Sequence, residues 1–411
     1  MRNGIGDCAV RRGGAEECDV AIIGAGITGA LVADALVSTG LRVVVLESRE
    51  VAQGSTAAST ALLQYEIDTH LVDLAKMLGP ELATRAYRAC LASFERLERR
   101  FPELLAGADY ERRASLYLAA DKDAVPFLRT ELAARRAIGI ACEWVDEAEL
   151  IKRFGCRRPA AILSALGAQI DPVRLTRAVL AGCERHGVEI RQHVNVEAID
   201  DGGEMLTLRS DDARTLRARQ VVVCAGYESL RFLPRDIART INIDNTFALV
   251  TEPLDATGLA RVLPLIWESA RPYTYIRTTR DGRLLVGGAD VPFKSAVARE
   301  ALLPRQIRRL AAAYEDLFGS PLPEIAYAWA GSFARTGDGL PYIGCVPGMN
   351  PRLQFALCYG GNGITYSAHA GEIVRAGIEG GAHALDEVFG FGRLQTAVSG
   401  EQLQGKVGAG D

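Results

Sequence analysis

Residues 19–29 read DVAIIGAGITG, and this stretch decides the fold. Its apolar first half predicts a buried strand. Its second half has the Gly-x-Gly-x-x-Gly spacing and leads into a helix that we expect over residues 30–39. A second apolar strand is predicted at residues 42–46, and it ends at Glu47. A strand, a glycine turn, a helix and a second strand ending in an acid together predict the βαβ unit that binds an ADP group.

Each glycine of this motif has its own physical role. Gly24 allows a tight turn after the strand, Gly26 lets the backbone approach a pyrophosphate, and Gly29 lets the helix pack closely on the strand. The N-terminus of the following helix then offers unpaired N–H groups and the positive end of its dipole to the phosphates.

Glu47 is placed to accept hydrogen bonds from the ribose hydroxyls of the adenosine, and Ser48 follows it. An acid at this position disfavours a 2′-phosphate, so NADP is not expected. Glycines at strand–helix turns are also common in proteins that bind no nucleotide. Here the strands, the helix and the terminal acid are all in register, which favours ADP binding.

The composition is typical of a globular protein. The chain has 411 residues, of which 48% are hydrophobic and 24% charged, and this length predicts two domains. The net charge of −4 gives no reason to expect nucleic-acid binding. The apolar run at residues 20–37 is interrupted by three glycines and by Asp34, so we expect no membrane span.

The nine cysteines are odd in number and scattered, and no Cys-x-x-Cys pair occurs. This pattern predicts reduced thiols in a cytoplasmic protein. The five histidines show no metal-ligand spacing, so no metal site is expected.

Later in the chain, helical and strand-like patterns follow one another. We expect helices at residues 71–100, 123–138, 172–185, 304–318 and 364–379. We expect strands at residues 115–120, 188–196, 205–209, 219–224, 246–251, 273–277, 284–287 and 353–358. The Asp281-Gly282 pair predicts a hairpin. The strands near positions 20, 43, 190, 222 and 355 are expected to form one buried sheet.

Five motifs in this order give the chain a family resemblance. After the first glycine motif come Gly54–Thr60 (GSTAAST), Asp171-Pro172 at the start of a helix, Val221–Gly226 (VVVCAG), and Thr-x-Asp-Gly-x-Pro-x-Ile-Gly at 336–344 paired with Gly-Gly-Asn-Gly-Ile at 360–364. With these motifs the chain resembles the D-amino-acid-oxidase-like (DAO) flavoproteins, a family that includes glycine oxidase, sarcosine oxidase and gamma-glutamylputrescine oxidase. The resemblance spans residues 19–380.

The resemblance implies an α/β fold with an α+β second domain. A glutathione-reductase-like Rossmann domain that binds FAD, rather than NAD, is interleaved with a substrate domain built on an antiparallel sheet. We expect the discontinuous FAD-binding domain at residues 18–70, 156–239 and 330–385, and the substrate-binding domain at 71–155 and 240–329. A flexible leader at 1–17 and a tail at 386–411, disordered beyond Gln395, complete the division.

The resemblance also implies which residues hold FAD. The small-residue loop at 54–60 passes the flavin, and the turn at 360–363 donates N–H groups to the negative charge of the reduced ring. A flexible loop and an ordinary strand–helix turn are the alternatives. The expected residues are Gly24, Gly26, Ile27, Thr28, Gly29, Glu47, Ser48, Gly54, Ser55, Thr56, Ala58, Ser59, Thr60, Val196, Ala225, Gly226, Asp338, Gly339, Gly360, Gly361, Asn362, Gly363 and Ile364.

Covalent attachment of the flavin is not expected. Some members of this family link the flavin to a Cys or a His. The Cys position falls near Gly331 in this chain, and the early loop holds no His. Non-covalent FAD is therefore predicted.

Candidates for contact with the substrate are fewer. Relatives place a carboxylate-binding Arg at the position of Phe333, and Arg335 follows on the same face of an extended segment. Tyr273, Tyr275 and Arg277 alternate, so one strand face would carry an Arg that can hold a carboxylate and two rings that wall the pocket. A solvated face or an ion pair is the alternative for Arg277, and plain core is the alternative for the tyrosines.

Three further polar residues have weaker assignments. Gln64 follows the flavin loop and could orient an amine, although loop capping explains it equally well. His70 could act as a base, but it precedes a helix, which favours capping or a surface position. Lys294 could activate oxygen, and a surface lysine is the alternative.

Together these observations predict an FAD-dependent oxidoreductase. It would remove a hydride from the C–N carbon of a small amine or amino acid to give an imine, and pass the electrons to O₂ or another acceptor. One alternative is FAD-dependent oxidation of a 2-hydroxy acid or polyol. Another is a non-catalytic nucleotide-binding protein. The sequence leaves the oligomeric state open.

Overall fold

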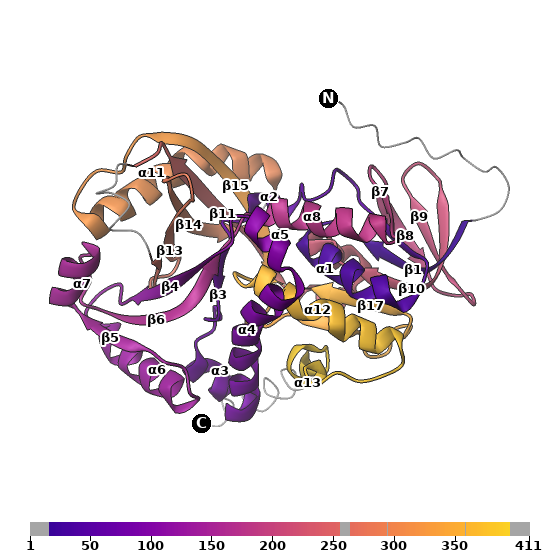
Figure 1. Cartoon of the computed structure of the whole chain (residues 1–411), viewed down its shortest axis with the longest axis horizontal. Helices are drawn as coiled ribbons and strands as arrows, with labels where there is room; N and C mark the ends of the chain where they lie inside the picture. The colour runs from indigo at the N-terminus through magenta and orange to yellow at the C-terminus, as the bar shows by residue number, and fades with distance from the viewer. Residues whose placement is uncertain (1–15, 255–263, 294, 358, 395–411) are drawn as a thin grey trace, which may run out of the picture.

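The computed structural model describes residues 16–254, 264–293, 295–357 and 359–394. Two sheets organise this part of the chain, one at the right and one at the left of Figure 1. The expected α/β fold, with a largely parallel first sheet and a mostly antiparallel, curled second sheet, is confirmed. Within the described residues no helix is long and apolar enough to cross a membrane.

The first sheet has the order β16-β17-β10-β1-β2-β7. All of its neighbours pair in parallel except the edge strand β16. The strands are β1 (Glu16–Ile23), β2 (Val43–Leu46), β7 (Glu189–Arg191), β10 (Thr215–Val223), β16 (Tyr342–Cys345) and β17 (Leu353–Leu357). The expected sheet of strands near 20, 43, 190, 222 and 355 is therefore confirmed.

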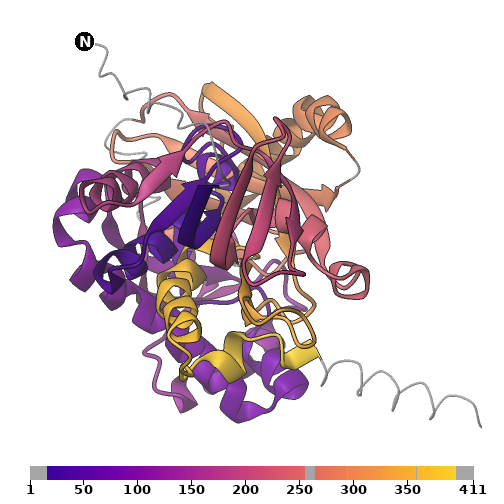
Figure 2. The ribbon, with the colours of Figure 1, turned by 90° about the vertical axis from the view of Figure 1, so that its right-hand side faces the viewer.

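The two faces of this sheet are covered differently. Val20 and Ile22 of β1 pack with helices α1 (Ile27–Leu36), α8 (Pro172–Arg185) and α12 (Gly363–Ile378). Alternate residues Ala21 and Ile23 pack on the other side. There the antiparallel hairpin of β8 (Val196–Asp200) and β9 (Leu206–Ser210) continues from β10 and stands in front in Figure 2.

The first glycine turn has the predicted geometry. Gly24 has φ +108, and a Cβ there would lie 2.6 Å from the Cys224 carbonyl oxygen. A Cβ at Gly29 would lie 1.9 Å from the Gly24 carbonyl oxygen. No side chain fits at either position, so the strand–turn–helix unit depends on both glycines.

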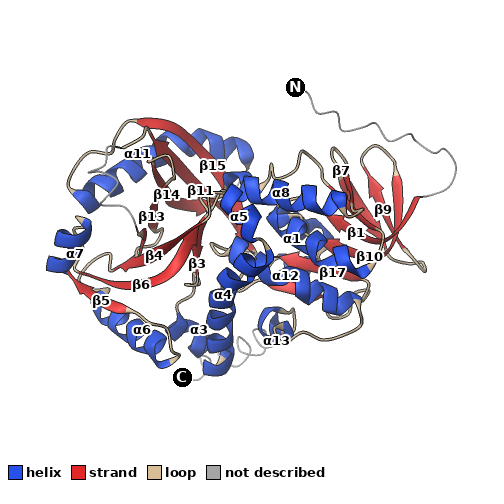
Figure 3. Cartoon of the chain, viewed as in Figure 1, coloured by secondary structure: helices blue, strands red, loops and turns tan. Residues whose placement is uncertain are grey.

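The second sheet has the order β15-β11-β14-β13-β12-β4-β6-β3, and β5 pairs with β6. Only the β12–β4 pair is parallel. Figure 3 shows these strands in red around the left half of the molecule. They are β3 (Leu62–Gln64), β4 (Glu111–Leu118), β5 (Glu143–Asp146), β6 (Ala160–Gln169), β11 (Asn242–Thr251), β12 (Leu265–Glu268), β13 (Thr274–Thr278), β14 (Leu284–Pro292) and β15 (Ile325–Arg335).

Helices cover the second sheet and join it to the first. The long α11 (Ala296–Phe318) packs its Leu310, Tyr314 and Leu317 against β11 and β14. The remaining helices are α2 (Ser55–Ala58), α3 (Leu71–Leu78), α4 (Pro80–Arg100), α5 (Pro102–Gly107), α6 (Val125–Ala137), α7 (Glu147–Phe154), α9 (Arg235–Ala238) and α13 (Asp386–Phe389), with 3-10 turns η1 (Val37–Thr39) and η2 (Gly226–Phe232).

Several predicted elements differ from the structure at their ends, and three differ more strongly. The single helix expected at 71–100 is two helices, because Gly79 has φ +88 and Pro80 starts the next one. The strand expected at 188–196 is two short strands, β7 and β8. The helix expected from Pro304 begins earlier, at Ala296, because the Ser295 side chain caps it and Pro304 is tolerated inside it.

The domain boundaries stay a prediction, although strand pairing bears on them. β3, β6 and most of β15 lie in segments assigned to the FAD-binding domain, yet they pair in the second sheet. Of the predicted leader, Glu16 and Glu17 belong to β1, and residues 1–15 lie outside the described residues. The expected tail begins with packed structure, since Phe389 and Phe391 are buried. Its part from residue 395 on lies outside the described range.

Candidate active site

A groove with a cavity of about 410 Å³ runs between the two sheets. It is lined at one end by the Gly24 turn and at the other by the Gly360 turn before α12. All but three of the residues expected to hold FAD line this groove. The exceptions are Gly29, Asp338 and Gly339.

The nucleotide end of the groove is organised by Glu47. Its carboxylate accepts hydrogen bonds from the backbone N–H of Ala25 at 2.8 Å and of Arg49 at 2.9 Å. These bonds fix the acid beside the glycine turn, where a ribose would meet it. The N–H of Ile27 donates to Thr56 Oγ1 at 3.0 Å, so the small-residue loop is tied to the first turn of α1.

The loop at 54–60 is also held by the second sheet. Ser55 Oγ donates to the Ser332 carbonyl at 3.2 Å, and Trp329 Nε1 donates to the Ala58 carbonyl at 3.0 Å. A Cβ at Gly331, near the position that the family resemblance gives for a flavin-linking Cys, would lie 3.0 Å from Ala58 Cβ. These contacts join both sheets along the middle of the groove.

Arg277 and Arg335 do not reach the groove, contrary to the expectation for a carboxylate clamp. Arg277 is buried and donates to the carbonyls of Thr60 and Thr278. Burial lowers the pKa of Arg277 to about 10. Arg335 lies at the edge strand and pairs with Asp244. Arg277 therefore anchors the loop at 54–60, and Arg335 makes a peripheral ion pair.

The N-terminus of α12 holds the chain segment at 64–68. Gly361 N–H donates to Asp68 Oδ2 at 2.9 Å. Asn362 Nδ2 donates to the carbonyl of Gln64 at 3.0 Å and to that of Glu66 at 2.8 Å. The Gly360 turn is therefore both a source of N–H donors and the anchor of the polar segment beside it.

Asp338 and Gly339 support this turn from outside the groove. Asp338 accepts hydrogen bonds from Leu340 N–H at 3.0 Å and from the buried Arg393 at 2.9 Å. The Gly339 carbonyl accepts from Tyr366 of α12 at 2.7 Å. Neither residue lines the groove. Through these hydrogen bonds they hold the 336–344 motif against α12 and Arg393.

The far wall of the groove is aromatic and acidic. Tyr273 and Tyr275 line it as expected, and Trp267 of β12 joins them. The Tyr273 and Tyr275 rings lie 5.9 Å apart, and the Tyr273 hydroxyl donates to Asp68 Oδ1 at 3.0 Å. Because Asp68 also binds Gly361, this wall adjoins the Gly360 turn.

Gln64 lines the groove as predicted, and its side-chain nitrogen is buried without a hydrogen-bond partner among the described residues. Polar groups on the groove that the sequence did not indicate include Asp68, Asp290 and Arg299. The glycine pair before Asp290, inside a predicted strand, was the one available signal for that residue.

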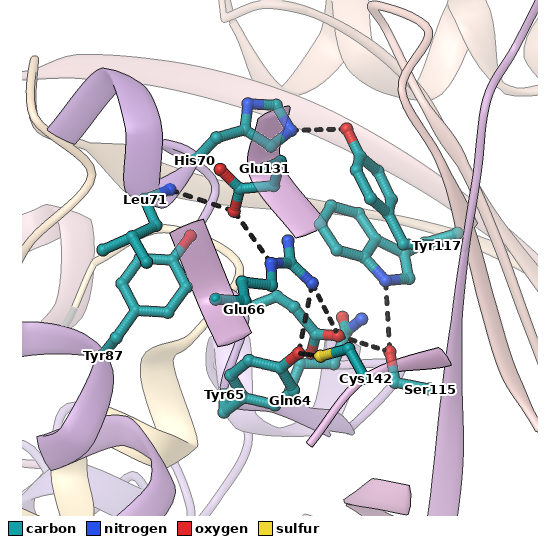
Figure 4. Close-up of polar contacts among 12 residues, drawn as sticks. Gln64, Tyr65, Glu66, His70, Leu71, Tyr87, Ser115, Tyr117, Glu131 and Cys142 are labelled. Carbon is teal, nitrogen blue, oxygen red and sulfur yellow. Dashed lines mark hydrogen bonds and ion pairs between the residues drawn. The ribbon is translucent and has the colours of Figure 1, made fainter. Parts of the chain in front are cut away.

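Behind the wall lies a buried ionic cluster, which Figure 4 draws. Arg135, fully buried, pairs with Glu131 at 2.8 Å and with Glu66 at 3.5 Å. Ser115 donates to Glu66 at 2.8 Å and accepts from Trp267 Nε1 at 3.3 Å. Burial raises the pKa of Glu66, and Arg135 opposes this rise. The cluster therefore supports the groove wall through Trp267 and Glu66.

Glu131 also caps α3, since its carboxylate accepts from the backbone N–H groups of Leu71 and Val72, each at 3.1 Å. His70 occupies the N-cap position of this helix as expected, but its side chain makes no capping hydrogen bond and is mostly buried. Its ring contacts the Tyr117 hydroxyl, and burial lowers the pKa of His70 to about 4. His70 is thus neutral at pH 7. Lys294 lies outside the described residues.

Arg299 brings a positive charge to the groove from α11. Its guanidinium donates to Ser332 Oγ at 3.0 Å and pairs with Glu300 at 2.9 Å. Near the nucleotide end, Arg49 and Arg231 also line the groove. Among the described residues no group of His, Cys, Asp and Glu side chains is arranged to hold a metal ion.

The family model described as FAD dependent oxidoreductase (DAO) matches residues 19–376. The chain belongs to the DAO family of FAD-dependent oxidoreductases. The DAO resemblance seen in the sequence is therefore confirmed, and FAD is the cofactor typical of DAO proteins.

Individual relatives are distant. The chain is similar to the probable oxidoreductase OrdL of Haemophilus influenzae, with 22% identity over 89% of this chain and 84% of that protein. It is 27% identical to glycine oxidase of Bacillus licheniformis over 87% of this chain and 91% of that enzyme. The crystal structure of glycine oxidase from Geobacillus kaustophilus matches with a TM-score of 0.73 and 20% identity, covering 91% of this chain and 98% of that one. At that identity the likeness shows the DAO fold alone.

The groove suits the cofactor of the DAO family. At one end, Gly26 leaves so little room that a Cβ would lie 3.1 Å from Thr56 Oγ1, as expected where a backbone must approach a ligand. At the other end, Gly360 and Gly361 precede the sixteen-residue helix α12, whose dipole favours negative charge. Gln64 Nε2 on the groove wall supplies an unpaired donor.

Proposed function

We propose that this protein removes a hydride from the carbon next to nitrogen in an amine or amino acid, giving an imine that water hydrolyses. FAD, when bound, supplies the hydride acceptor. The observation that supports this most is the wall of Trp267, Tyr273, Tyr275 and Asp290 beside the Gly360 turn. An aromatic wall that carries a carboxylate suits a compound with a basic nitrogen.

The chain's own residues would divide the remaining work. We propose that the Gly24 turn and Glu47 hold the diphosphate and ribose, and that the Gly360 turn holds the ring end without a covalent bond. The aromatic wall would exclude water from the carbon that loses its hydride, since imines hydrolyse readily. Cys18, Cys90, Cys142, Cys156, Cys183 and Cys345 form no disulfide, which supports a cytoplasmic location as a part of this proposal.

Anaerobic bleaching of the bound flavin tests this function. The purified holoenzyme is mixed without oxygen with primary amines, secondary amines, amino acids, 2-hydroxy acids and glycerol phosphate, and the visible flavin absorbance is followed. We expect amines or amino acids to bleach the flavin and release an aldehyde or keto acid with ammonia or an amine. Bleaching by hydroxy acids or glycerol phosphate alone would overturn the proposal.

Two side results of the same experiment sharpen it. Rapid recovery of the colour in air would identify O₂ as the acceptor, whereas slow recovery would indicate another acceptor. Acid precipitation should release the yellow cofactor into the supernatant. A yellow pellet would contradict non-covalent binding.

A further inference from the structure

Strand β14 is irregular where it enters the groove. Gly288 pairs with Phe247 and Val291 pairs with Asn245, so Ala289 and Asp290 together face the single residue Thr246. This is a β-bulge, and bulges commonly re-aim a side chain next to an active site. Ala289 has φ +53, a value that non-glycine residues rarely adopt.

The surroundings enforce this bulge. A Cβ at Gly288 would lie 2.1 Å from the Tyr273 carbonyl oxygen, and one at Gly287 would lie 2.3 Å from the Tyr275 ring. The buried Gln306 of α11 donates to the Ala289 carbonyl at 2.7 Å. The strained backbone is therefore held from both sides, which is typical of a position where the strain serves a function.

The bulge turns Asp290 into the groove. Asp290 lines the groove, and its Oδ1 is buried with no hydrogen-bond partner in the described part of the chain. Its carboxylate interacts with the Thr246 hydroxyl, which lies 3.3 Å from the Tyr275 hydroxyl. A buried carboxylate oxygen without a partner is costly, so it is expected where a ligand supplies the missing donor.

The charges around Asp290 have mixed signs. Burial, followed by weaker effects of Asp68 and Asp244, raises the pKa of Asp290 to about 7, while Thr246 and Arg271 act in the opposite direction. Above this pH the side chain is a carboxylate, and below it the side chain is a neutral acid.

We propose that Asp290 binds the substrate by its amino group and accepts the ammonium proton, so that the substrates are cationic amines rather than compounds held by a carboxylate. This rests on the proposed function. The substrate enters as R–CH₂–NH₃⁺, one N–H bond breaks, and the proton passes to Asp290 Oδ1. The products of this step are R–CH₂–NH₂ and a neutral Asp290, and no electrons are exchanged.

This step makes the oxidation possible. Only the neutral amine has the lone pair that drives loss of hydride from its carbon, and a free alkylamine is almost fully protonated at pH 7. Desolvation in the groove lowers the pKa of the ammonium and raises that of the carboxylate. The two pKa values then lie close enough for the proton to pass from one group to the other. The rings of Trp267, Tyr273 and Tyr275 line the same wall and attract a cation before that transfer.

The arginines do not favour a carboxylate-bearing substrate. Arg277 and Arg335 are engaged outside the groove. Arg299 lines the groove, but it is already bound to Ser332 and Glu300. If Arg299 were instead the clamp, α-amino acids would be preferred to amines of the same chain length.

The experiment compares Asp290→Asn with wild type in anaerobic flavin reduction by butylamine and by 2-aminobutyrate. Asp123→Asn, at an exposed aspartate away from the groove, is the matched control. We expect butylamine to be preferred by wild type and Asp290→Asn to reduce its rate constant by about 100-fold or more, as for loss of a proton acceptor. The control should be unchanged.

The pH profile supplies a second readout. The rate of flavin reduction by the amine in wild type should fall as pH drops below about 7, because Asp290 then becomes protonated. In Asp290→Asn this decrease in rate at low pH, the acid limb of the pH profile, should be absent. Thr246→Val, which removes the hydroxyl beside the carboxylate, should move the limb to higher pH. If Asp290→Asn failed to fold, the shift in Thr246→Val would still decide the matter.

A third readout needs no turnover. Folding raises the pKa of Asp290 from 3.8 to about 7. This group therefore lowers the free energy of unfolding as the pH rises from about 4 to 7, and it lowers it no further above that range. Asp290→Asn should therefore have a higher Tm than wild type at pH 8, and the gain should shrink at pH 5. A Tm difference that is equal at both pH values would contradict the buried carboxylate.

The outcomes separate the two proposals. If amines bleach the wild type and Asp290→Asn behaves like wild type, the proposed function stands and the role of Asp290 is overturned. A preference for 2-aminobutyrate that disappears in Arg299→Met would also overturn it in favour of carboxylate binding. If neither amines nor amino acids bleach the flavin, the proposed function itself fails.

Discussion

Two glycine pairs shape the groove, and they differ in what surrounds them. Gly29 packs against Gly24 within the same turn, and both glycines also meet Cys224, directly after the neighbouring strand β10. Gly287 and Gly288 pack against Tyr275 and Tyr273 of a neighbouring strand. The first pair belongs to a motif that can be recognised in one short stretch of sequence, and we propose that it holds the FAD. The second pair shapes the wall that contains Tyr273 and Tyr275, and its role can be recognised only once the strands are paired.

The buried ionic cluster adjoins the groove, and its disruption should have the largest effect on stability. Arg135→Met leaves Glu66 and Glu131 buried without their cation, which typically costs about 3–5 kcal/mol. We expect loss of folded protein or a strongly lowered midpoint in urea unfolding. Arg136→Met, at the neighbouring exposed arginine, is the control. An unchanged midpoint for Arg135→Met would show that the cluster does not support the wall.

Gly29→Ala tests the first glycine pair, Gly24 and Gly29. The new Cβ would lie 1.9 Å from the Gly24 carbonyl oxygen, so the helix must move away from the strand. Such overpacking typically costs about 1–3 kcal/mol of stability or more. We expect purified protein with little flavin and a lowered Tm, measured by the ratio of visible to ultraviolet absorbance and by thermal unfolding. Gly107→Ala, where nothing lies within 4 Å, should behave as wild type. Full flavin content in Gly29→Ala would contradict this packing.

Gly288→Ala tests the second glycine pair, Gly287 and Gly288. It combines φ +126 with a contact of 2.1 Å to the Tyr273 carbonyl, so the bulge must change. We expect the variant to keep its flavin, since the Gly24 turn is intact, and to lose most substrate-driven bleaching. If Gly288→Ala instead lost its flavin while the remaining holoenzyme bleached normally, the separate roles of the two glycine pairs would be contradicted.

Arg277→Met should have the smallest effect. The side chain anchors the Thr60 carbonyl from outside the groove, so we expect weaker FAD binding by a few-fold and an almost unchanged KM for the substrate. Titration of apoprotein with FAD and steady-state kinetics would measure both. A large rise of KM with unchanged FAD affinity would restore Arg277 as a substrate clamp.

The sequence predicted the parts of this molecule whose cause is local. The turn at Gly24, the start of α8 at Asp171 and Pro172, and the turn before α12 follow from residues within one or two turns of chain. The Asp171 carboxylate caps Val173 and Arg174, which explains why that boundary was correct. The resemblance to a family then supplied the cofactor.

The missed residues depend on partners far along the chain. Asp290 reaches the groove because β14 bulges against β11, and Arg299 reaches it because α11 begins earlier than Pro304 suggests. His70 was expected at a helix cap or on the surface, because the sequence does not show that Tyr117, on β4, is its partner. Arg277 was grouped with the substrate because it alternates with Tyr273 and Tyr275, and Arg335 because it follows the position of Phe333 on the same strand face. The structure shows that neither of them reaches the groove.

The most direct test is the crystal structure of the holoenzyme with butylamine bound. The account predicts an FAD diphosphate over the Gly24 turn and the amine nitrogen within about 2.7–3.2 Å of Asp290 Oδ1. An amine nitrogen held elsewhere, with Asp290 Oδ1 still unpartnered, would contradict it.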